Sequence, residues 1–204
     1  MTYEIELKAW VEDPELTGER LSRLARFTDT FYRDDTYWFP PEGFTAGAEG
    51  LPASGIRIRK EQLQPAQGEE THSVWVTYKS KEVREGIEVN REHEFLVSGR
   101  DGGDSAFEEL LRRLNFAPGA AKVKRGRAWR SGDIRAELTL VEGLGWFVEM
   151  EILVDRDDPE TRENARKQLL ELLDKTGIRR DKIEERYYTE LIACAGRNHG
   201  TSGI

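Results

Sequence analysis

The chain has 204 residues, of which 37% are hydrophobic and 34% are charged, so its core is modest and its remainder is unusually charged. The net charge of −8 argues against a general nucleic-acid surface. The single cysteine, Cys194, excludes an internal disulfide, and the three histidines are too scattered for a zinc site. No apolar run is long enough for a membrane helix. We therefore expect a cytoplasmic protein with no nucleic-acid or membrane partner.

The length is typical of one domain, which we expect to span 1–195, with 196–204 as a disordered tail. The chain begins with a predicted strand at 2–11. Asp13 and Pro14 then predict the N-cap and the first residue of a helix. The apolar stripe of this helix is expected to contain Leu16, Leu21, Leu24 and Phe27.

Strands and loops alternate through the middle of the chain. β-branched and aromatic residues predict strands at about 28–39, 56–59, 74–79 and 87–97. Glycine and proline mark loops at about 40–53, a candidate lid, and at 63–70. One aromatic cluster suits base stacking, although such residues more often belong to a core. It consists of Phe31, Tyr32, Tyr37, Trp38 and Phe39.

The second half contains a predicted helix followed by three strands, and then two more helices. The helix is expected at 104–114 and the strands at 121–130, 134–141 and 146–154. The last two helices are expected at 159–175, capped by Asp157 or Asp158, and at 181–193. Gly143-Leu144-Gly145 lies between two strands, so it is not a phosphate-binding loop. About eight strands, mostly antiparallel neighbours, with a few helices between them predict an α+β fold.

Charged residues alternate with apolar residues along most of the predicted strands. Because successive side chains of a strand point to opposite faces, Glu4, Glu6 and Lys8 share one face, and Ile5 and Leu7 share the other. Later strands repeat this pattern with mixed charges on one face. Those charged positions are Arg57, Arg59, Lys79, Glu92, Glu94, Lys122, Lys124, Arg135, Glu137, Glu149 and Glu151.

Two architectures fit this alternation. In the first, a plain antiparallel sheet exposes its charged face to solvent, where cross-strand ion pairs contribute about 0.2–1 kcal/mol each. In the second, about eight strands close into a β-barrel with the charges inside and the helices packed on its apolar outer surface. The alternation alone leaves both open.

An enclosed charged interior would require ligands of both signs. Neighbouring carboxylates cannot all remain ionised without a cation, and Mg²⁺ or Mn²⁺ with oxygen ligands would supply it. Lysine and arginine side chains opposite the metal would then need an anion. A triphosphate bridged to the metal satisfies both requirements.

The segment Glu4-x-Glu6-x-Lys8 resembles the E-x-E-x-K signature of the CYTH superfamily, the triphosphate tunnel metalloenzymes. These include class IV adenylyl cyclases, thiamine triphosphatases and inorganic triphosphatases. Further segments resemble later motifs of the family in the same order along nearly the whole chain, which favours the barrel. They are Ile56-Arg57-Ile58-Arg59, Thr77-Tyr78-Lys79, Arg91-Glu92-His93-Glu94, the stretch 141–151 and Tyr187-Tyr188-Thr189-Glu190-Leu191.

The resemblance implies a role for each matching position. It assigns the metal to Glu4, Glu6, Glu149 and Glu151, with Glu92, Glu94 and Glu137 as further candidates. It assigns the triphosphate to Lys8, Arg57, Lys79 and Lys124, and the shared strand face adds Lys122, Arg59 and Arg135. For Arg59 and Arg135, ion pairing with neighbouring acids is an equal alternative. Catalysis is assigned to Glu6, Lys8 and Glu149, and the general base is Glu6, Glu149 or a metal-bound hydroxide.

Two positions depart from the family pattern. Where cyclases of the family have Lys-x-Arg, this chain has Lys124-Arg125-Gly126, so Lys122 would substitute, or Arg125 or Arg127 if a bulge shifts the register. An expected aspartate is replaced by Thr139, for which Glu137 is the candidate substitute.

Two reactions of a bound triphosphate fit the resemblance. In a cyclase, the 3′-hydroxyl of ATP attacks the α-phosphorus and releases pyrophosphate. In a phosphohydrolase, water attacks the terminal phosphorus of thiamine triphosphate or tripolyphosphate. The Glu4-Ile5-Glu6-Leu7-Lys8 start is closer to the cyclase branch. A module that binds polyphosphate or a nucleotide without turnover is a third alternative, and a homodimer is the default oligomer.

Overall fold

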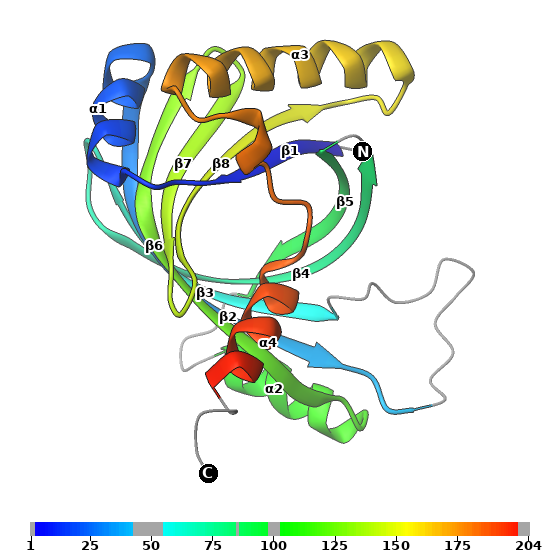
Figure 1. Cartoon of the computed structure of the whole chain (residues 1–204). Coiled ribbons are helices and arrows are strands. Elements are labelled where there is room, and N and C mark those ends of the chain that lie inside the picture. The colour runs from blue at the N-terminus through cyan, green and yellow to red at the C-terminus, as the bar shows by residue number, and fades with distance from the viewer. Residues whose placement is uncertain (1–2, 43–54, 85, 98–102, 200–204) are drawn as a thin grey trace.

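The computed structural model describes residues 3–42, 55–84, 86–97 and 103–199, without the side chains of 79–82, 84, 91–92, 103–105 and 196–199. The first half contains β1 (Tyr3–Trp10), α1 (Pro14–Leu24), β2 (Arg26–Phe39), β3 (Ile56–Pro65), β4 (Thr71–Arg84) and β5 (Ile87–Leu96). The second half contains α2 (Gly103–Arg113), β6 (Ala117–Ser131), β7 (Ile134–Val141), β8 (Gly145–Val154), α3 (Pro159–Thr176), a 3₁₀ turn (Arg180–Lys182) and α4 (Tyr188–His199) (Figure 1). Within these ranges, no helix is both long and apolar enough to cross a lipid bilayer.

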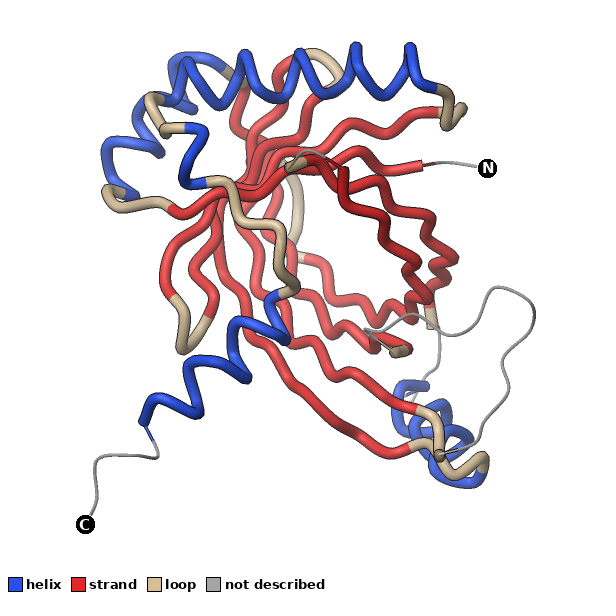
Figure 2. Tube along the Cα trace, turned by 45° about the vertical axis from the view of Figure 1, so that its right-hand side comes forward, coloured by secondary structure: helices blue, strands red, loops and turns tan. Residues whose placement is uncertain are grey.

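The strands form one antiparallel sheet that curls into a barrel (Figures 1 and 2). Among the described residues, the hydrogen-bonded order is β1-β5-β4-β3-β2-β6-β7-β8, and β8 pairs with β1 to return to the start. Every adjacent pair is antiparallel. The predicted α+β class with an antiparallel sheet is confirmed.

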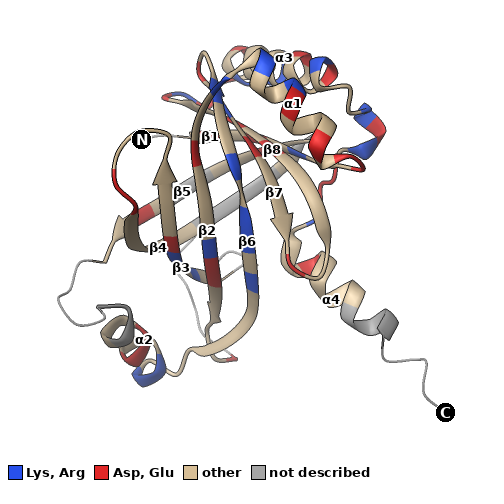
Figure 3. Ribbon diagram, turned by 90° about the vertical axis from the view of Figure 1, so that its left-hand side faces the viewer, with Lys and Arg blue, Asp and Glu red and all other residues tan. Residues whose placement is uncertain are grey.

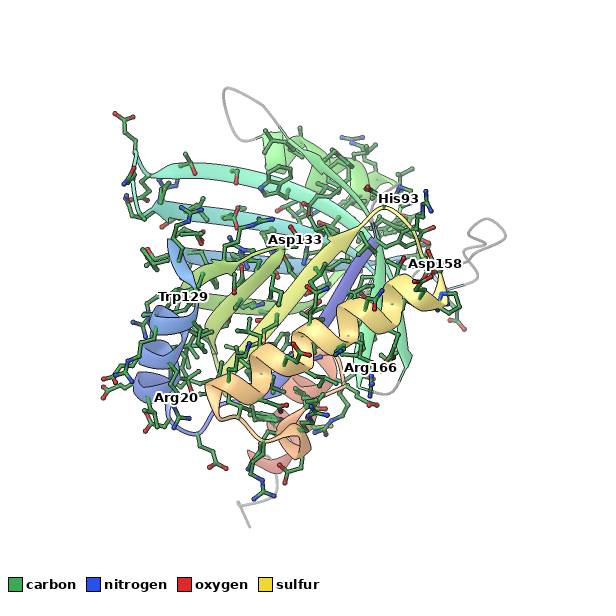
Figure 4. The ribbon with its side chains drawn as sticks, turned by 90° about the horizontal axis from the view of Figure 1, so that it is seen from above. Arg20, His93, Trp129, Asp133, Asp158 and Arg166 are labelled. Atoms are coloured by element: carbon green, nitrogen blue, oxygen red, sulfur yellow. The ribbon has the colours of Figure 1, made fainter. Side chains whose placement is uncertain are left out.

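The apolar faces of the strands point outward, where helices cover them. Ile5 and Leu7 of β1 and Met150 of β8 are fully buried in one cluster with Leu169 and Leu173 of α3. Figure 4 shows α3 lying across the strands at this side of the barrel. α1 joins the same layer, where the Trp129 indole donates a hydrogen bond to Ser22 Oγ at 3.2 Å (Figure 4).

Two smaller apolar clusters hold the other helices. Leu111 of α2 is buried against Trp38 and Ile58 on the outer side of β2 and β3. The third cluster lies at one end of the barrel, where α4 begins with Tyr188 beside Phe147. Phe147 lies two residues before Glu149, so it belongs to the inward face of β8, and this end of the interior is apolar.

Several predicted boundaries are wrong. α1 ends at Leu24, and Phe27 instead lies in β2, where it contacts the Trp129 ring edge to face at 6.0 Å. The last helix begins at Tyr188 because the preceding backbone pairs with β1, through the Ala9–Ile183 bridge and a 2.9 Å hydrogen bond from Glu184 N to Lys8 O.

The disordered tail was predicted to begin at residue 196, but α4 continues to His199. Residues 200–204 lie outside the described residues. The predicted loop at 63–70 is shorter, since β3 extends to Pro65 and β4 starts at Thr71. Most of the candidate lid at 40–53 lies outside the described residues. Of the two candidate caps of α3, the structure uses Asp158, which accepts from Thr161 N at 2.9 Å.

We expect Leu169→Ala to lower the free energy of unfolding by about 2–5 kcal/mol, because Leu169 is fully buried between α3 and the barrel. Leu110→Ala in α2 is the matched control, since that side chain is 49% exposed, and we expect a change below about 1 kcal/mol. Urea unfolding of both variants measures the difference. Equal effects would contradict the outward-facing core.

Candidate functional site

A cavity of about 310 Å³ lies inside the barrel, and charged side chains from most strands line it. Figure 3 shows both acidic and basic positions along β2 and only basic ones along the neighbouring β6. Every site residue predicted from the sequence whose side chain is described lines this cavity. These are Glu4, Glu6, Lys8, Arg57, Arg59, Glu94, Lys122, Lys124, Arg135, Glu137, Glu149 and Glu151. The backbones of Lys79 and Glu92 are opposite each other on β4 and β5, but their side chains lie outside the described part of the structure.

Carboxylates gather where β1, β5 and β8 run side by side. Glu6 is opposite Glu151 in the β1–β8 register and opposite Glu88 in the β1–β5 register. Asn90 of β5 donates through Nδ2 to Glu4 Oε2 and to Glu6 Oε2, both at 3.2 Å. The Asn90 side chain therefore lies between the two carboxylates of the N-terminal motif.

The donor set in this region suits a hard cation. Asn90 is fully buried, and its Oδ1 accepts no hydrogen bond among the described residues. A buried amide oxygen without a donor is unfavourable, and a divalent cation beside Glu4 and Glu6 would satisfy it. The described His, Cys, Asp and Glu residues nevertheless form no group of three already close enough to hold a metal. The carboxylates would have to move to bind one.

Two lysines of the cavity each pair with one carboxylate. Lys8 Nζ lies 2.6 Å from Glu88 Oε1, and Lys124 Nζ lies 2.6 Å from Glu149. Burial alone would raise the pKa of Glu149, but the Lys124 ammonium outweighs it, and the pKa lies below its ordinary value. Burial and the neighbouring Lys122 lower the pKa of Lys124, which Glu149 only partly opposes.

Asp35 joins two of the basic side chains. It is fully buried, its carboxylate accepts two hydrogen bonds from Arg59 at 2.7 and 3.0 Å, and it lies 3.2 Å from Lys122 Nζ. Burial would raise the pKa of Asp35, but the Arg59 and Lys122 charges hold it well below its ordinary value. Arg59 thus takes the ion-paired arrangement that the sequence left open, while still lining the cavity.

Arg135 is also ion-paired, and so is Arg33, which the sequence analysis did not name as a site residue. Arg135 contacts Asp29 at 2.9 Å and Glu137 at 2.9 Å. Arg33 of β2 donates two parallel hydrogen bonds to Glu137 at 2.7 and 3.0 Å, and one to Glu61 at 2.7 Å. Both oxygens of Glu137 are therefore taken by guanidinium groups, which suits a residue that orients arginines better than a metal ligand.

The Leu138 carbonyl and the Phe31 ring explain the glycine at position 126. A Cβ atom at Gly126 would lie 2.4 Å from Leu138 O and 2.8 Å from Phe31 Cζ, so no arginine fits there. The Phe31 ring occupies that space, and Arg33 Cζ lies 4.1 Å from the ring centre. A guanidinium from the adjacent strand thus lies near the position where the family pattern has its arginine.

The other positions at which the chain departs from the family pattern, and the other suggested substitutes for the missing arginine, differ in burial. Lys122 lines the cavity, as its strand face predicts. Arg125 and Arg127 are exposed, and the register between β2 and β6 has no irregularity at these positions. Thr139, opposite Gly126, is fully buried, and its hydroxyl has no hydrogen-bond partner among the described residues.

The aromatic cluster at 31–39 divides between the two faces of β2. Tyr37 lines the cavity and accepts a 2.9 Å hydrogen bond from Lys122. Trp38 lies in the outer core, and Tyr32 is 39% exposed. Alternation along β2 places Arg33, Asp35 and Tyr37 on the inward face, and this was the signal that the sequence analysis did not use.

The interior of this antiparallel barrel mixes carboxylates with ammonium and guanidinium groups, so it offers partners to ligands of either charge. The sequence matches the CYTH domain family over residues 2–188. The chain therefore belongs to the CYTH domain family, as its sequence motifs indicate.

Individual relatives cover nearly the whole chain. A Methanocaldococcus jannaschii protein named as a candidate adenylate cyclase is 24% identical over 192 residues, which are 92% of this chain and 97% of that protein. A solved structure of a Pyrococcus horikoshii protein has a TM-score of 0.73 at 25% identity, covering 93% of this chain and 98% of the other. A Hippeastrum adenylyl cyclase candidate described as having a dominant triphosphatase activity has a TM-score of 0.62 at 18% identity, covering 95% and 96%.

We expect Gly126→Ala to lower the free energy of unfolding by about 1–3 kcal/mol, because the new methyl group would press on the Leu138 carbonyl. Gly18→Ala in α1 is the control. Its Cβ would meet the flexible end of Arg127, and alanine favours a helix, so we expect little change or a small gain. Urea unfolding compares the two, and an equally well tolerated Gly126→Ala would contradict the crowding.

We expect Asp35→Asn to lower the free energy of unfolding by about 3–5 kcal/mol at pH 7, because it leaves Arg59 and Lys122 without their buried partner. Since the pKa of Asp35 is lowered in the folded state, its contribution is present above about pH 4 and is lost as the pH falls further. Between pH 5 and pH 3 the free energy of unfolding should therefore fall less for the variant than for the wild type. Each unit by which the folded state lowers the pKa of Asp35 corresponds to about 1.4 kcal/mol, which urea unfolding at each pH can resolve.

Asp34→Asn is the matched control, because Asp34 is the neighbouring residue on the opposite face of β2 and is only partly buried. It should change the stability by less than about 1 kcal/mol and keep the acid sensitivity of the wild type. Parallel curves for wild type and Asp35→Asn would show that Asp35 has an ordinary pKa.

Proposed function

We propose that this protein is a metal-dependent enzyme that binds a triphosphate inside its barrel, with an adenylate cyclase-like reaction as the leading candidate. The observation that supports it most directly is the single cavity wall shared by the carboxylates of β1 and β8 and the basic side chains of β3, β6 and β7. A solvated sheet face would not gather both charge types around one enclosed space.

In this proposal the basic side chains bind the phosphate oxygens. Lys8, Lys122 and Lys124 supply ammonium groups, and Arg57 and Arg59 supply forked guanidinium groups. Arg57 reaches across to β4 and β5, where it contacts Thr77 at 2.9 Å and Glu94 at 3.2 Å. Lys79 remains a proposed contact by its family motif.

The carboxylates of the N-terminal motif and of β8 would hold the metal. Glu4, Glu6, Glu149 and Glu151 are the proposed ligands, and Asn90 is placed to add an amide oxygen. Bound Mg²⁺ or Mn²⁺ would neutralise the triphosphate and polarise the phosphorus under attack. Glu6 and Glu149 are also the proposed acceptors of the nucleophile's proton, with a metal-bound hydroxide as the alternative.

The cyclase reaction leads because the Methanocaldococcus relative, which matches 92% of this chain, is named as a candidate adenylate cyclase. In that reaction the 3′-oxygen of ATP bonds to the α-phosphorus, the bond to the β-phosphate oxygen breaks, and pyrophosphate leaves. The attacking hydroxyl loses its proton to a cavity carboxylate or to solvent. The products are cyclic AMP and pyrophosphate.

One observation favours triphosphate hydrolysis as the second candidate. Of the five residues of the aromatic cluster at 31–39, Tyr37 alone is among the described residues that line the cavity, and Lys122 already contacts it. The other two aromatic residues of the described lining, Tyr187 and Tyr188, come from the C-terminal segment. A small inorganic triphosphate or thiamine triphosphate does not need an adenine pocket. The Hippeastrum protein of similar fold is itself described as having a dominant triphosphatase activity.

One assay distinguishes these functions. The purified protein is incubated with ATP, thiamine triphosphate or tripolyphosphate, each with Mg²⁺ or Mn²⁺. Cyclic AMP with pyrophosphate identifies a cyclase, and orthophosphate identifies a hydrolase. Binding without product identifies a non-catalytic module, and absence of both binding and turnover for all three compounds would overturn the proposal.

We expect Glu6→Gln to lower turnover at least about 100-fold, because the amide cannot neutralise the metal or accept a proton. Glu171→Gln on the exposed side of α3 removes the same charge far from the cavity and should leave turnover unchanged. Steady-state rates of both variants under the best metal and substrate make the comparison. Full activity in Glu6→Gln would remove Glu6 from the metal site.

A further inference from the structure

The geometry points to Tyr188 as a positioning residue whose aromatic ring gathers three lysines into one triphosphate-binding cluster. This inference rests on the proposed function, and it assigns to the C-terminal segment a part in ligand binding. Tyr188 is the first residue of α4 and lines the cavity.

Three ammonium groups surround the same ring. The distances from the ring centre to Nζ are 5.5 Å for Lys8, 5.0 Å for Lys122 and 5.1 Å for Lys124. Each distance lies within the range of about 6 Å in which the electron-rich face of a ring attracts a cation. Cations that repel one another thus share one neutral group that attracts all of them.

The sheet itself does not bring these lysines together. Lys8 belongs to β1, whereas Lys122 and Lys124 belong to β6, and β7 and β8 lie between these strands in the hydrogen-bonded order. Each ammonium pairs with a different carboxylate. Lys8 pairs with Glu88, Lys122 with Asp35, and Lys124 with Glu149. The Tyr188 ring lies close to all three ammonium groups.

Neighbouring aromatic rings and a backbone anchor fix the position of the Tyr188 ring. It contacts the Phe147 ring edge to face at 4.9 Å, and Phe147 contacts the Trp10 ring at 4.1 Å. The chain before Tyr188 is fixed to β1 through Glu184, whose N donates to Lys8 O and whose carboxylate accepts from Trp10 Nε1 at 3.1 Å. Figure 1 shows this segment descending from α3 across the end of the barrel to α4.

The hydroxyl of Tyr188 is expected to stay protonated. Burial raises its pKa well above the ordinary value, and the Glu149 and Glu6 carboxylates raise it further. The lysines therefore face a neutral phenol ring and not a phenolate. The test therefore varies the aromatic ring and its attraction for cations, and not the charge of the oxygen.

The test measures tripolyphosphate binding by isothermal titration calorimetry, with Mg²⁺ and with a chelator. We expect Tyr188→Phe, which keeps the ring, to bind within about twofold of the wild type. Tyr188→Leu, which keeps an apolar side chain without a ring, should bind about tenfold more weakly. Tyr32→Leu is the control, because Tyr32 is 39% exposed and does not line the cavity, and it should bind as the wild type does.

A second series works even if the leucine variant does not fold. The Tyr188→Phe variant is compared with versions whose new ring carries one, two or three fluorine atoms, which weaken the attraction for cations stepwise while nearly preserving the shape of the ring. We expect the affinity for tripolyphosphate to fall with each fluorine. Equal affinity across the series, or in a folded Tyr188→Leu, would overturn the inference. If the wild type does not bind tripolyphosphate, the same variants are titrated with ATP and with thiamine triphosphate. Failure of the wild type to bind any of the three compounds in either buffer would instead overturn the proposed function.

Discussion

A charge that leaves water must find a partner, and this requirement governs the interior of the barrel. Desolvating an isolated carboxylate or ammonium costs several kcal/mol even after the protein relaxes. The described cavity meets that cost with pairs that join different strands: Lys8 with Glu88, Lys124 with Glu149, and Asp35 with both Arg59 and Lys122. The ion pairs therefore cross-link the strands from inside, while the apolar clusters hold the helices to the outside.

The same requirement explains why the two ends of the interior differ. Charged residues line the cavity, whereas Trp10 and Phe147 continue the inward faces of β1 and β8 with aromatic rings. Tyr188 lies at this boundary, with Phe147 on one side and the lysine ammonium groups on the other. A tyrosine suits such a boundary because its ring is apolar enough for a core and yet attracts cations.

Alternation along the strands was enough to predict which residues share a face, and the family resemblance then indicated that this face lines the interior. Glu4, Glu6, Glu149 and Glu151 were placed by counting residues, because a strand has a fixed period of two. The same count would have placed Arg33 and Asp35, but the aromatic residues around them suggested a core strand. Neither Gly126 nor Tyr188 could be understood from the sequence. The role of Gly126 depends on how close the Leu138 carbonyl and the Phe31 ring lie, and that of Tyr188 depends on a helix start set by pairing between 183–184 and β1.

Ion pairs in the cavity also constrain what the proposed ligand must be. A phosphate that binds Lys124 competes with Glu149, and a metal that binds Glu149 competes with Lys124, because these two groups lie 2.6 Å apart. Either ligand alone would leave a buried charge without its partner, which is the costly case for a buried pair. A metal and a polyphosphate that arrive together replace both partners at once. The paired interior therefore favours a metal-bound polyanion over a free metal or a free anion, and this preference follows from the geometry of the ion pairs whichever phosphorus is attacked.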